Sequence, residues 1–296
     1  MRCYFVCLLT AATFVGCSKS STDSSPPAAK PAAGSHAEHG GAAGHDHGAM
    51  SGGEHGGHGA KAAHGDHASD PGKIVVQNDA ADFQAGEEAR LRFTLQHGDK
   101  VVTEFDLLHT KKVHFIAVRE GLDQFMHLHP EVGSDGELTT GITFPVAGRY
   151  WLFADHQPQG GSPATARGEI VVAGDAPPAK KLTANVPGRV TGNGLQAEIA
   201  VDSSGGASET SITFALLDDA GAPVSDLQTY LGAMGHLVIL SADGRDYVHA
   251  HNDAKSAPDG RVTFEAHFAK PGLYKGWGQF RRGEDVSTVP FVIEVK

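Results

Sequence analysis

Histidines recur in two stretches of the chain at one spacing. In residues 113–130, VHFIAVREGLDQFMHLHP, and in residues 235–252, GHLVILSADGRDYVHAHN, a histidine is followed thirteen residues later by a His-x-His pair. The imidazole nitrogen is a preferred ligand of Zn²⁺ and copper ions. The repeated spacing therefore indicates two sets of candidate metal ligands: His114, His127, His129, His236, His249 and His251.

The turn signals predict how each set comes together. Residues 242–245, ADGR, place an Asp-Gly pair between two apolar runs, which is typical of a two-residue hairpin turn. His236 would then face His251, and His249 would share that face because side chains alternate along a strand. The same pairing in the first repeat sets His114 opposite His129, with His127 beside them. Each hairpin is predicted to gather three imidazoles into its own metal site.

Three further side chains could complete these sites. His109 and His156 are candidate extra ligands in the first repeat, and Met234 is one in the second. A thioether favours Cu(I), so we expect the second site to prefer Cu(I) more than the first does. Imidazoles bind metal when neutral, so affinity should fall as the pH drops through about 6.5.

The surrounding sequence predicts an all-β protein. From residue 73 onward, short β-rich runs alternate with Gly, Asp, Asn and Pro, and no run keeps a helical period. Matching spacings of histidines and glycines in the two halves indicate a tandem duplication. We therefore expect two Ig-like β-sandwich domains, at residues 73–174 and 182–296, joined by a linker at 175–181.

The first residues have the features of an export signal. Residues 1–17 combine Arg2, a short apolar run and a lipobox-like end, TFVGC, which predicts lipidation of Cys17; a plain signal peptide is the alternative. The run is shorter than a membrane span. Ser18 favours the outer over the inner membrane. We expect a periplasmic, lipid-anchored protein, secreted across the inner membrane, whose mature form has one cysteine and no internal disulfide.

Residues 18–72 are rich in Gly, Ala, Ser, Pro and His and have few large apolar side chains. This composition predicts a disordered tether, acting as a plain spacer or as a weak metal collector. Its candidate ligands are His36, His39, His45, His47, His55, His58, His64 and His67. The formal net charge of −11 disfavours nucleic acid as a partner and favours cations.

Several phrases resemble a family of secreted bacterial proteins. These include HFIAVREGLDQFMHLHPE, FPVAGRYWLFADHQP and DLQTYLGAMGHLVIL, and they are similar to YtkA-like and CopC-like copper-handling domains. The resemblance covers residues 73–296 and implies Ig-like sandwiches that bind metal in the periplasm. CopC-like proteins commonly use an N-terminal histidine as a ligand, and a lipidated Cys17 would take that place here.

The leading hypothesis is a non-enzymatic protein that sequesters, buffers or delivers copper or zinc, with a metal transporter or efflux protein as partner. The main alternative is an adhesive or scaffolding Ig-like module whose histidines bind no metal. A bicupin enzyme fits less well, because Glu131 lies too close to the His-x-His pair and Glu137 too far from it. A blue-copper centre needs a cysteine thiolate, and residues 73–296 contain none.

Overall fold

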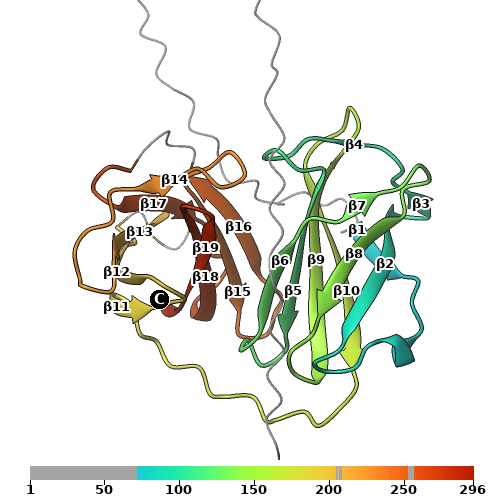
Figure 1. The fold of residues 1–296 in the computed structure, drawn as a ribbon, viewed down its shortest axis with the longest axis horizontal. Helices are drawn as coiled ribbons and strands as arrows, with labels where there is room; N and C mark the ends of the chain where they lie inside the picture. Colours follow the sequence, from blue (N-terminus) through green and yellow to red (C-terminus); the bar gives the residue numbers. More distant parts are fainter. Residues whose placement is uncertain (1–71, 205, 207–208, 253–256) are drawn as a thin grey trace, which may run out of the picture. The chain divides into compact units, whose positions relative to one another are not determined.

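The protein folds as two β-sandwiches that follow one another along the chain (Figure 1). The structure is a computed structural model that describes residues 72–204, 206, 209–252 and 257–296. All of these belong to one compact unit of the chain. Apart from a single 3-10 turn, Ala80–Asp82, the regular elements among them are strands. The all-β prediction with two tandem domains is therefore confirmed.

The first sandwich is a single sheet folded over on itself. Its strand order is β6-β5-β9-β10-β1-β2-β8-β7, with β3 paired to β2 and β4 to β9. β1 closes the fold because it pairs in parallel with β10 and antiparallel with β2. The strands are β1 Gly72–Val76, β2 Glu88–His97, β3 Lys100–Val101, β4 Phe105–Asp106, β5 Val113–Arg119, β6 Phe125–Leu128, β7 Glu131–Val132, β8 Leu138–Thr143, β9 Gly148–Pro158 and β10 Ala164–Val172.

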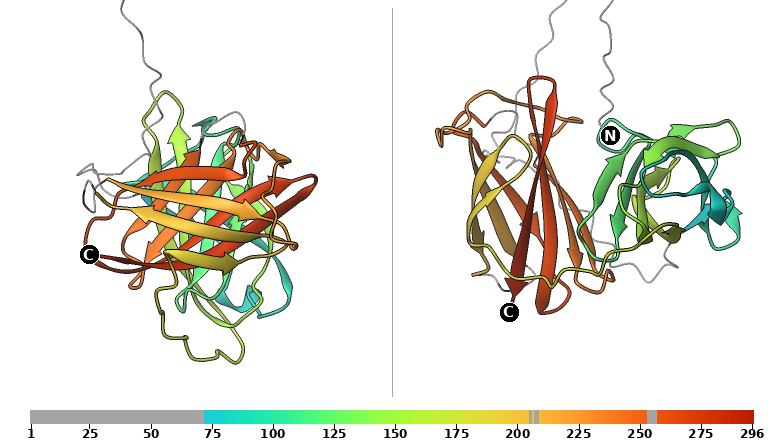
Figure 2. Two further views of the ribbon diagram at one scale, coloured as in Figure 1. Left: turned by 90° about the vertical axis from the view of Figure 1, so that its left-hand side faces the viewer. Right: turned by 60° about the horizontal axis from the view of Figure 1, so that its bottom comes forward.

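The second sandwich has two separate sheets that face one another (Figure 2). One has the order β11-β12-β13-β17, and the other has the order β14-β18-β15-β16, with β19 also paired to β18. The strands are β11 Gly188–Thr191, β12 Gln196–Asp202, β13 Thr210–Leu217, β14 Leu227–Gln228, β15 Gly235–Ser241, β16 Tyr247–Asn252, β17 Arg261–Ala266, β18 Gly272–Arg282 and β19 Asp285–Val295.

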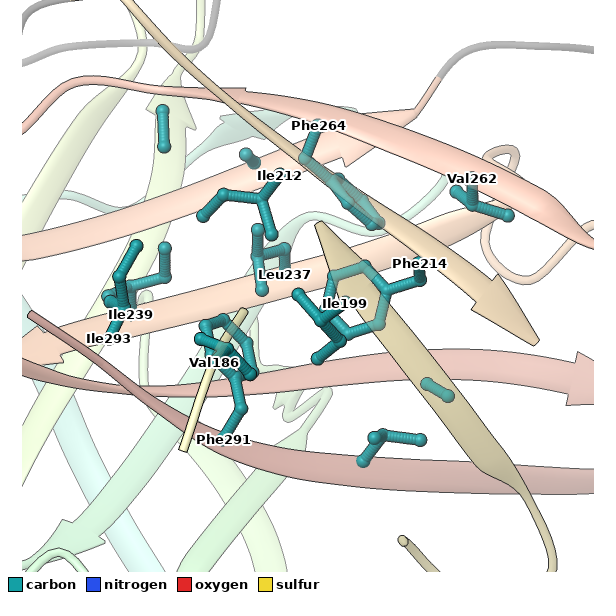
Figure 3. Packing of buried hydrophobic residues seen from close by; sticks show 14 of the residues in the cluster. Val186, Ile199, Ile212, Phe214, Leu237, Ile239, Val262, Phe264, Phe291 and Ile293 are labelled. Carbon is teal, nitrogen blue, oxygen red and sulfur yellow. The ribbon is translucent and has the colours of Figure 1, made fainter. Parts of the chain in front are cut away.

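Each sandwich has its own hydrophobic core between its sheet layers. In the second sandwich, Phe214, Phe264 and Phe291 fill the space together with aliphatic side chains such as Leu237 and Ile239 (Figure 3). Strand β17 shows the expected pattern, because alternate residues are buried and exposed along Arg261–Ala266.

Strands β5 and β15 depart from this alternation, because every residue in each of them is buried. Phe115 of β5 and Leu237 of β15 point into the sandwich cores. Their neighbours Ile116 and Val238 belong to a third apolar cluster, which contains residues of both sandwiches. Because side chains on both faces of β5 and β15 are buried, the outer faces of these sheets are covered as well. Strands covered on both faces are typically near-continuous apolar runs.

The hairpin registers agree with the sequence prediction. In the second sandwich His236 pairs with His251 and Val238 with His249. In the first, Phe115 pairs with Leu128 and Ile116 with His127, which is the register that sets His114 opposite His129. The three histidines of each hairpin therefore lie at one end of the outer sheet face.

Candidate metal centre at the joint between the sandwiches

The outer faces of the two sheets meet in a reciprocal apolar contact. Phe125 of the first sandwich stacks on Trp277 of the second, with ring centroids 4.8 Å apart and planes 12° apart. Phe153 of the first stacks on Tyr247 of the second at 4.3 Å and 4°. Phe125 and Tyr247 occupy equivalent places in the two repeats, as do Phe153 and Trp277. The interface therefore has the pseudo-twofold, self-complementary character of a homodimer contact, here within one chain.

At one end of this interface the six predicted histidines form one cluster. Within the first sandwich, ring centroids lie 5.4 Å apart for His114 and His127, 4.9 Å for His114 and His129, and 4.8 Å for His127 and His129. Across the joint, the rings of His127 and His249 lie 5.2 Å apart. The sequence predicted two separate sites. The structure places both sets in a single centre, because the two histidine-bearing faces are docked against each other.

The second sandwich contributes its three imidazoles in the same arrangement. Ring centroids lie 4.5 Å apart for both His236–His251 and His249–His251, and 5.9 Å for His236–His249. One nitrogen each from His114, His127 and His129 lie within 4.8 Å of one another. The same is true of one nitrogen each from His114, His236 and His249.

Backbone carbonyls fix the proton position on one histidine of each set. Nε2 of His114 lies 2.9 Å from the carbonyl oxygen of Leu108, and Nε2 of His236 lies 2.8 Å from that of Tyr230. A carbonyl oxygen only accepts hydrogen bonds, so Nε2 carries the proton in both rings. Nδ1 of each ring is left as an acceptor, and Nδ1 of His114 faces the imidazoles of His127 and His129.

A second histidine of each set is oriented by a residue from the opposite sandwich. Nδ1 of His127 donates to Oε1 of Gln279 at 2.7 Å, and Nδ1 of His249 donates to a carboxylate oxygen of Asp155 at 2.7 Å. Asp155 and Gln279 are equivalent residues of β9 and β18, and each pairs across its own sheet with His114 or His236. Each sandwich thus supplies the group that orients a metal-ligand candidate of the other.

Asp155 is buried and accepts three hydrogen bonds. Besides His249, its donors are the hydroxyl of Tyr247 at 2.5 Å and that of Thr165 at 2.6 Å. Burial alone would raise the pKa of this carboxyl group, but the hydrogen bond and charge of His249 and the two hydroxyl donors outweigh it and lower the pKa. Asp155 therefore places a buried negative charge beside the cluster.

The remaining ring nitrogens face one another as acceptors. Nδ1 of His114 lies 3.1 Å from Nε2 of His127 and 3.3 Å from Nε2 of His129. The proton of His114 is donated to Leu108 and that of His127 to Gln279. The lone pairs of the two remaining nitrogens therefore face each other at 3.1 Å. In the second set, Nδ1 of His236 and Nε2 of both His249 and His251 are buried without a hydrogen-bond partner. Buried polar atoms are normally paired, so these nitrogens point to a bound cation.

Burial keeps five of these imidazoles neutral, those of His114, His127, His129, His236 and His251. It is the largest cause of the lowered pKa of each, and the charge of a protonated His249 would lower the pKa of each of the five further. The pKa of His114 falls to about 3, that of His129 to about 4 and that of His236 to about 2. The pKa values of His127 and His251 are lowered too. The sequence suggested that metal affinity falls near pH 6.5, and these shifts move the expected loss to more acidic pH.

The three additional candidate ligands have different locations. His109 stacks on His251, with ring centroids 3.7 Å apart, at the edge of the cluster. His156 instead pairs with His97, Nε2 to Nε2 at 3.0 Å, while its Nδ1 donates to the carbonyl of Ala154. Met234 is buried in the core of the second sandwich, because the strand begins only at Gly235 and the alternation does not extend back to it. The proposed sulfur ligand is therefore withdrawn.

Sequence reasoning missed Asp155 and Gln279. A signal was present, since each is a polar residue in an otherwise largely apolar strand and the two occupy matching positions of the repeats. Residues 1–71, which include the predicted signal, Cys17 and the eight tether histidines, lie outside the described residues. Among the described residues, no helix is suited to crossing a membrane.

The chain belongs to the family described as Domain of unknown function (DUF8832), whose model matches residues 68–174 and again 190–296. This match confirms the tandem duplication. The matching family is not one of the copper-handling families that the sequence resembles. Among curated proteins, none matches this chain.

Solved structures resemble the chain only distantly. A tetra-tandem repeat from the extending region of a large adhesion protein has 12% identity and a TM-score of 0.26, covering 76% of this chain and 49% of that one. Yersinia pseudotuberculosis InvD has 15% identity and a TM-score of 0.24, covering 74% and 57%. A two-domain fibronectin type-III segment of chicken tenascin has 12% identity and a TM-score of 0.22, covering 76% and 100%. The chain thus spans about half the length of the first two, and these scores carry no argument about function.

Proposed function

We propose that this protein binds zinc or copper ions at the six-histidine centre between its two sandwiches. The observation that carries the proposal is the 3.1 Å contact between Nδ1 of His114 and Nε2 of His127, two rings whose other nitrogens face the oxygen acceptors of Leu108 and Gln279. Both nitrogens of the contact are therefore acceptors. Two nitrogens bound to one tetrahedral Zn²⁺ at 2.0–2.1 Å lie about 3.3 Å apart. The observed spacing is close to that value, so a cation fits where lone pairs would otherwise repel.

The surroundings of the cluster also suit a metal. Gln279 and Asp155 orient His127 and His249 through the nitrogen that would not bind the ion, as is usual for histidine ligands. The lowered pKa values of His114 and His236 keep these two ligands uncharged at neutral pH, so a metal would not have to displace a proton from their inward-facing nitrogens.

A surface groove touches the histidine cluster at His129. It is lined by Glu88, Arg90, His129 and Glu131, together with the exposed side of β8. His129 belongs both to this groove and to the histidine cluster. The two carboxylates would attract a cation to the groove, and His129 would be the first imidazole it meets.

In the cell, we place this activity in the periplasm, with the protein tethered to the membrane through Cys17. The tether histidines would collect ions and raise their concentration near the centre. Sequestration, buffering and delivery to a metal transporter or efflux protein are all consistent with such a site. We expect no enzymatic activity.

The second candidate is an adhesive or scaffolding module, in which the histidines only pack the joint. Adhesion and fibronectin-type proteins recur among the structural matches, at TM-scores of 0.22–0.26. The histidine geometry distinguishes the two candidates and can be tested directly. If the six histidines were structural, removing His127 and His129 would leave metal uptake unchanged.

The test is a calorimetric titration of the full chain with Zn²⁺ and with Cu²⁺. All eight tether histidines are replaced by Gln, so that only the centre is measured. We expect binding that the His127→Ala and His249→Ala double variant, which removes one histidine from each set, weakens at least tenfold, and that the control His267→Ala, outside the cluster, leaves unchanged. Affinity no tighter than high micromolar, or a double variant equal to the parent, would refute the proposal and favour the interaction module.

A further inference from the structure

The six inward-facing nitrogens are more than one metal ion can use. We infer that the centre holds two ions per chain, one on each set of three histidines, and that Asp155 makes the two sites unequal; this inference rests on the proposed function. Zn²⁺ in proteins takes four ligands. A single ion would leave at least two buried nitrogens unpaired, whereas two ions with three imidazoles each use all six.

The two sets offer the same atoms in the same roles. The first set presents Nδ1 of one histidine and Nε2 of two, and so does the second; these atoms are Nδ1 of His114 and His236 and Nε2 of His127, His129, His249 and His251. Three imidazoles leave one position of a tetrahedral ion open, as in zinc sites that exchange a water or another ligand. The ring centroids of the second set lie 4.5–5.9 Å apart, close to the 4.8–5.4 Å of the first, so the three imidazoles of each half can converge on one ion.

The two sites adjoin closely. A nitrogen of His114 lies within 4.8 Å of nitrogens of His236 and His249, although His114 belongs to the first set. Two divalent ions bound here would repel each other strongly, because the surroundings are buried and weakly screened. We therefore expect binding in two steps, with the second ion held more weakly than the first.

The charge of the orienting residues decides which half fills first. Asp155 accepts from Nδ1 of His249 and brings a buried negative charge to the second set, whereas the equivalent Gln279 is neutral. A dication gains more from a carboxylate behind its ligand than from an amide. The set of His236, His249 and His251 should bind the first divalent ion, and the set of His114, His127 and His129 the second.

Native mass spectrometry and calorimetry with Zn²⁺ would test this on the full chain without tether histidines. We expect two Zn²⁺ per chain in two resolved steps. Asp155→Asn should weaken the tighter step by about 10- to 100-fold, the usual cost of losing an outer-shell partner. Gln279→Glu places a carboxylate behind His127 of the first set. It should strengthen the weaker Zn²⁺ binding step and reduce the difference in affinity between the two steps.

Single-ligand variants and a spectroscopic measurement complete the experiment. His129→Ala should keep the tight step and lose the weak one, while His251→Ala should lose the tight step. With two Cu²⁺ bound, the electron paramagnetic resonance spectrum should show dipolar coupling between ions on one chain. Saturation at one Zn²⁺ per chain would overturn the inference and leave the proposed function standing; binding of neither Zn²⁺ nor Cu²⁺ would refute both. If Asp155→Asn fails to fold, Gln279→Glu alone still tests the role given to Asp155. Two unequal Zn²⁺ binding steps that Gln279→Glu leaves unchanged would overturn that role.

Discussion

At the scale of single residues, the centre depends on where each imidazole carries its proton. The carbonyls of Leu108 and Tyr230 and the side chains of Asp155 and Gln279 each accept from one ring nitrogen. None of these four acceptors needs to move for a metal to bind. The other nitrogen of each ring is thereby presented in advance, which lowers the entropy cost of assembling the site.

The neutral, buried histidines should make the metal-free protein acid-sensitive. The folded pKa of His114 is about 3 and that of His236 about 2, both because of burial first, whereas an unfolded histidine titrates near 6.5. Below pH 6.5 the unfolded state therefore binds more protons than the folded state, and stability falls as pH drops toward 3. Between pH 6.5 and the folded pKa, each such histidine should lower the free energy of unfolding by about 1.4 kcal/mol per pH unit. Above pH 7 it should have no such effect.

Denaturant unfolding in the presence of a chelator, measured from pH 8 to 5, would check this expectation. The range lies above the titration of ordinary carboxyl groups, so the slope reports histidines. The slope of the free energy of unfolding against pH gives the number of protons taken up on unfolding. His114→Gln and His236→Gln should each reduce that number by about one. A free energy of unfolding that stays constant from pH 8 to 5 would contradict the burial of neutral imidazoles.

At the scale of elements, two tight turns hold the carbonyls that orient His114 and His236. In the first turn His109 and Thr110 have φ of 46° and 70°, and in the second Leu231 and Gly232 have 50° and 82°. The amide of the fourth residue donates to the first carbonyl at 3.1 Å in both. Positive φ at both central positions is characteristic of a type I′ turn, in which glycine is favoured.

The two turns predict opposite effects for exchanged residues. Thr110→Gly should raise the free energy of unfolding by about 0.5–1 kcal/mol, because it relieves a left-handed threonine but makes the unfolded chain more flexible. Gly232→Thr should lower it by about 1–2 kcal/mol, since a Cβ there would also lie 3.1 Å from Cγ2 of Thr110. Urea unfolding of both variants would measure this. Shifts in the same direction would show that turn conformation does not govern these positions.

The local pattern predicted much of this element-level structure. The Asp-Gly turn specified that His236 faces His251, and the structure has that pair. Residues 113–119 and 235–241 also carried a signal of their docking, because their apolar residues do not alternate with polar ones. The partner of each covered face could not be inferred, since the contacts join residues far apart in the chain, 92 positions for Asp155 and Tyr247 and 152 for His127 and Gln279. The prediction that Met234 is a ligand was wrong because side-chain alternation holds only within a strand, and Met234 precedes the strand that begins at Gly235.

At the scale of the whole molecule, the duplication explains why one centre replaces two. A face that pairs with its own copy needs only one sequence pattern, repeated, to build both halves of an interface. The reciprocal stacks of Phe125 on Trp277 and of Tyr247 on Phe153 follow from that rule. Two departures from exact repetition, Asp155 against Gln279 and His109 against Leu231, lie at or beside the histidine cluster.

The metal centre should therefore depend on docking, even when every histidine is intact. Trp277 is buried in the joint, and Trp277→Ala removes its stack on Phe125 without touching an imidazole. Loss of a buried aromatic side chain costs about 3–5 kcal/mol. Because this loss falls on the joint, we expect the two sandwiches to unfold in separate transitions and Zn²⁺ affinity to drop at least tenfold.

Phe83→Ala is the matched control, because Phe83 is equally buried but lies in the core of the first sandwich. It should lower the stability of that sandwich and leave Zn²⁺ affinity of the folded protein nearly unchanged. Calorimetric unfolding with and without Zn²⁺ would compare the variants. Bound Zn²⁺ stabilises the docked form, in which Gln279 and Asp155 orient its ligands across the joint, by about 2.7 kcal/mol at a hundredfold excess over its Kd. If Trp277→Ala kept both the affinity and a single transition, the joint would not be what assembles the centre.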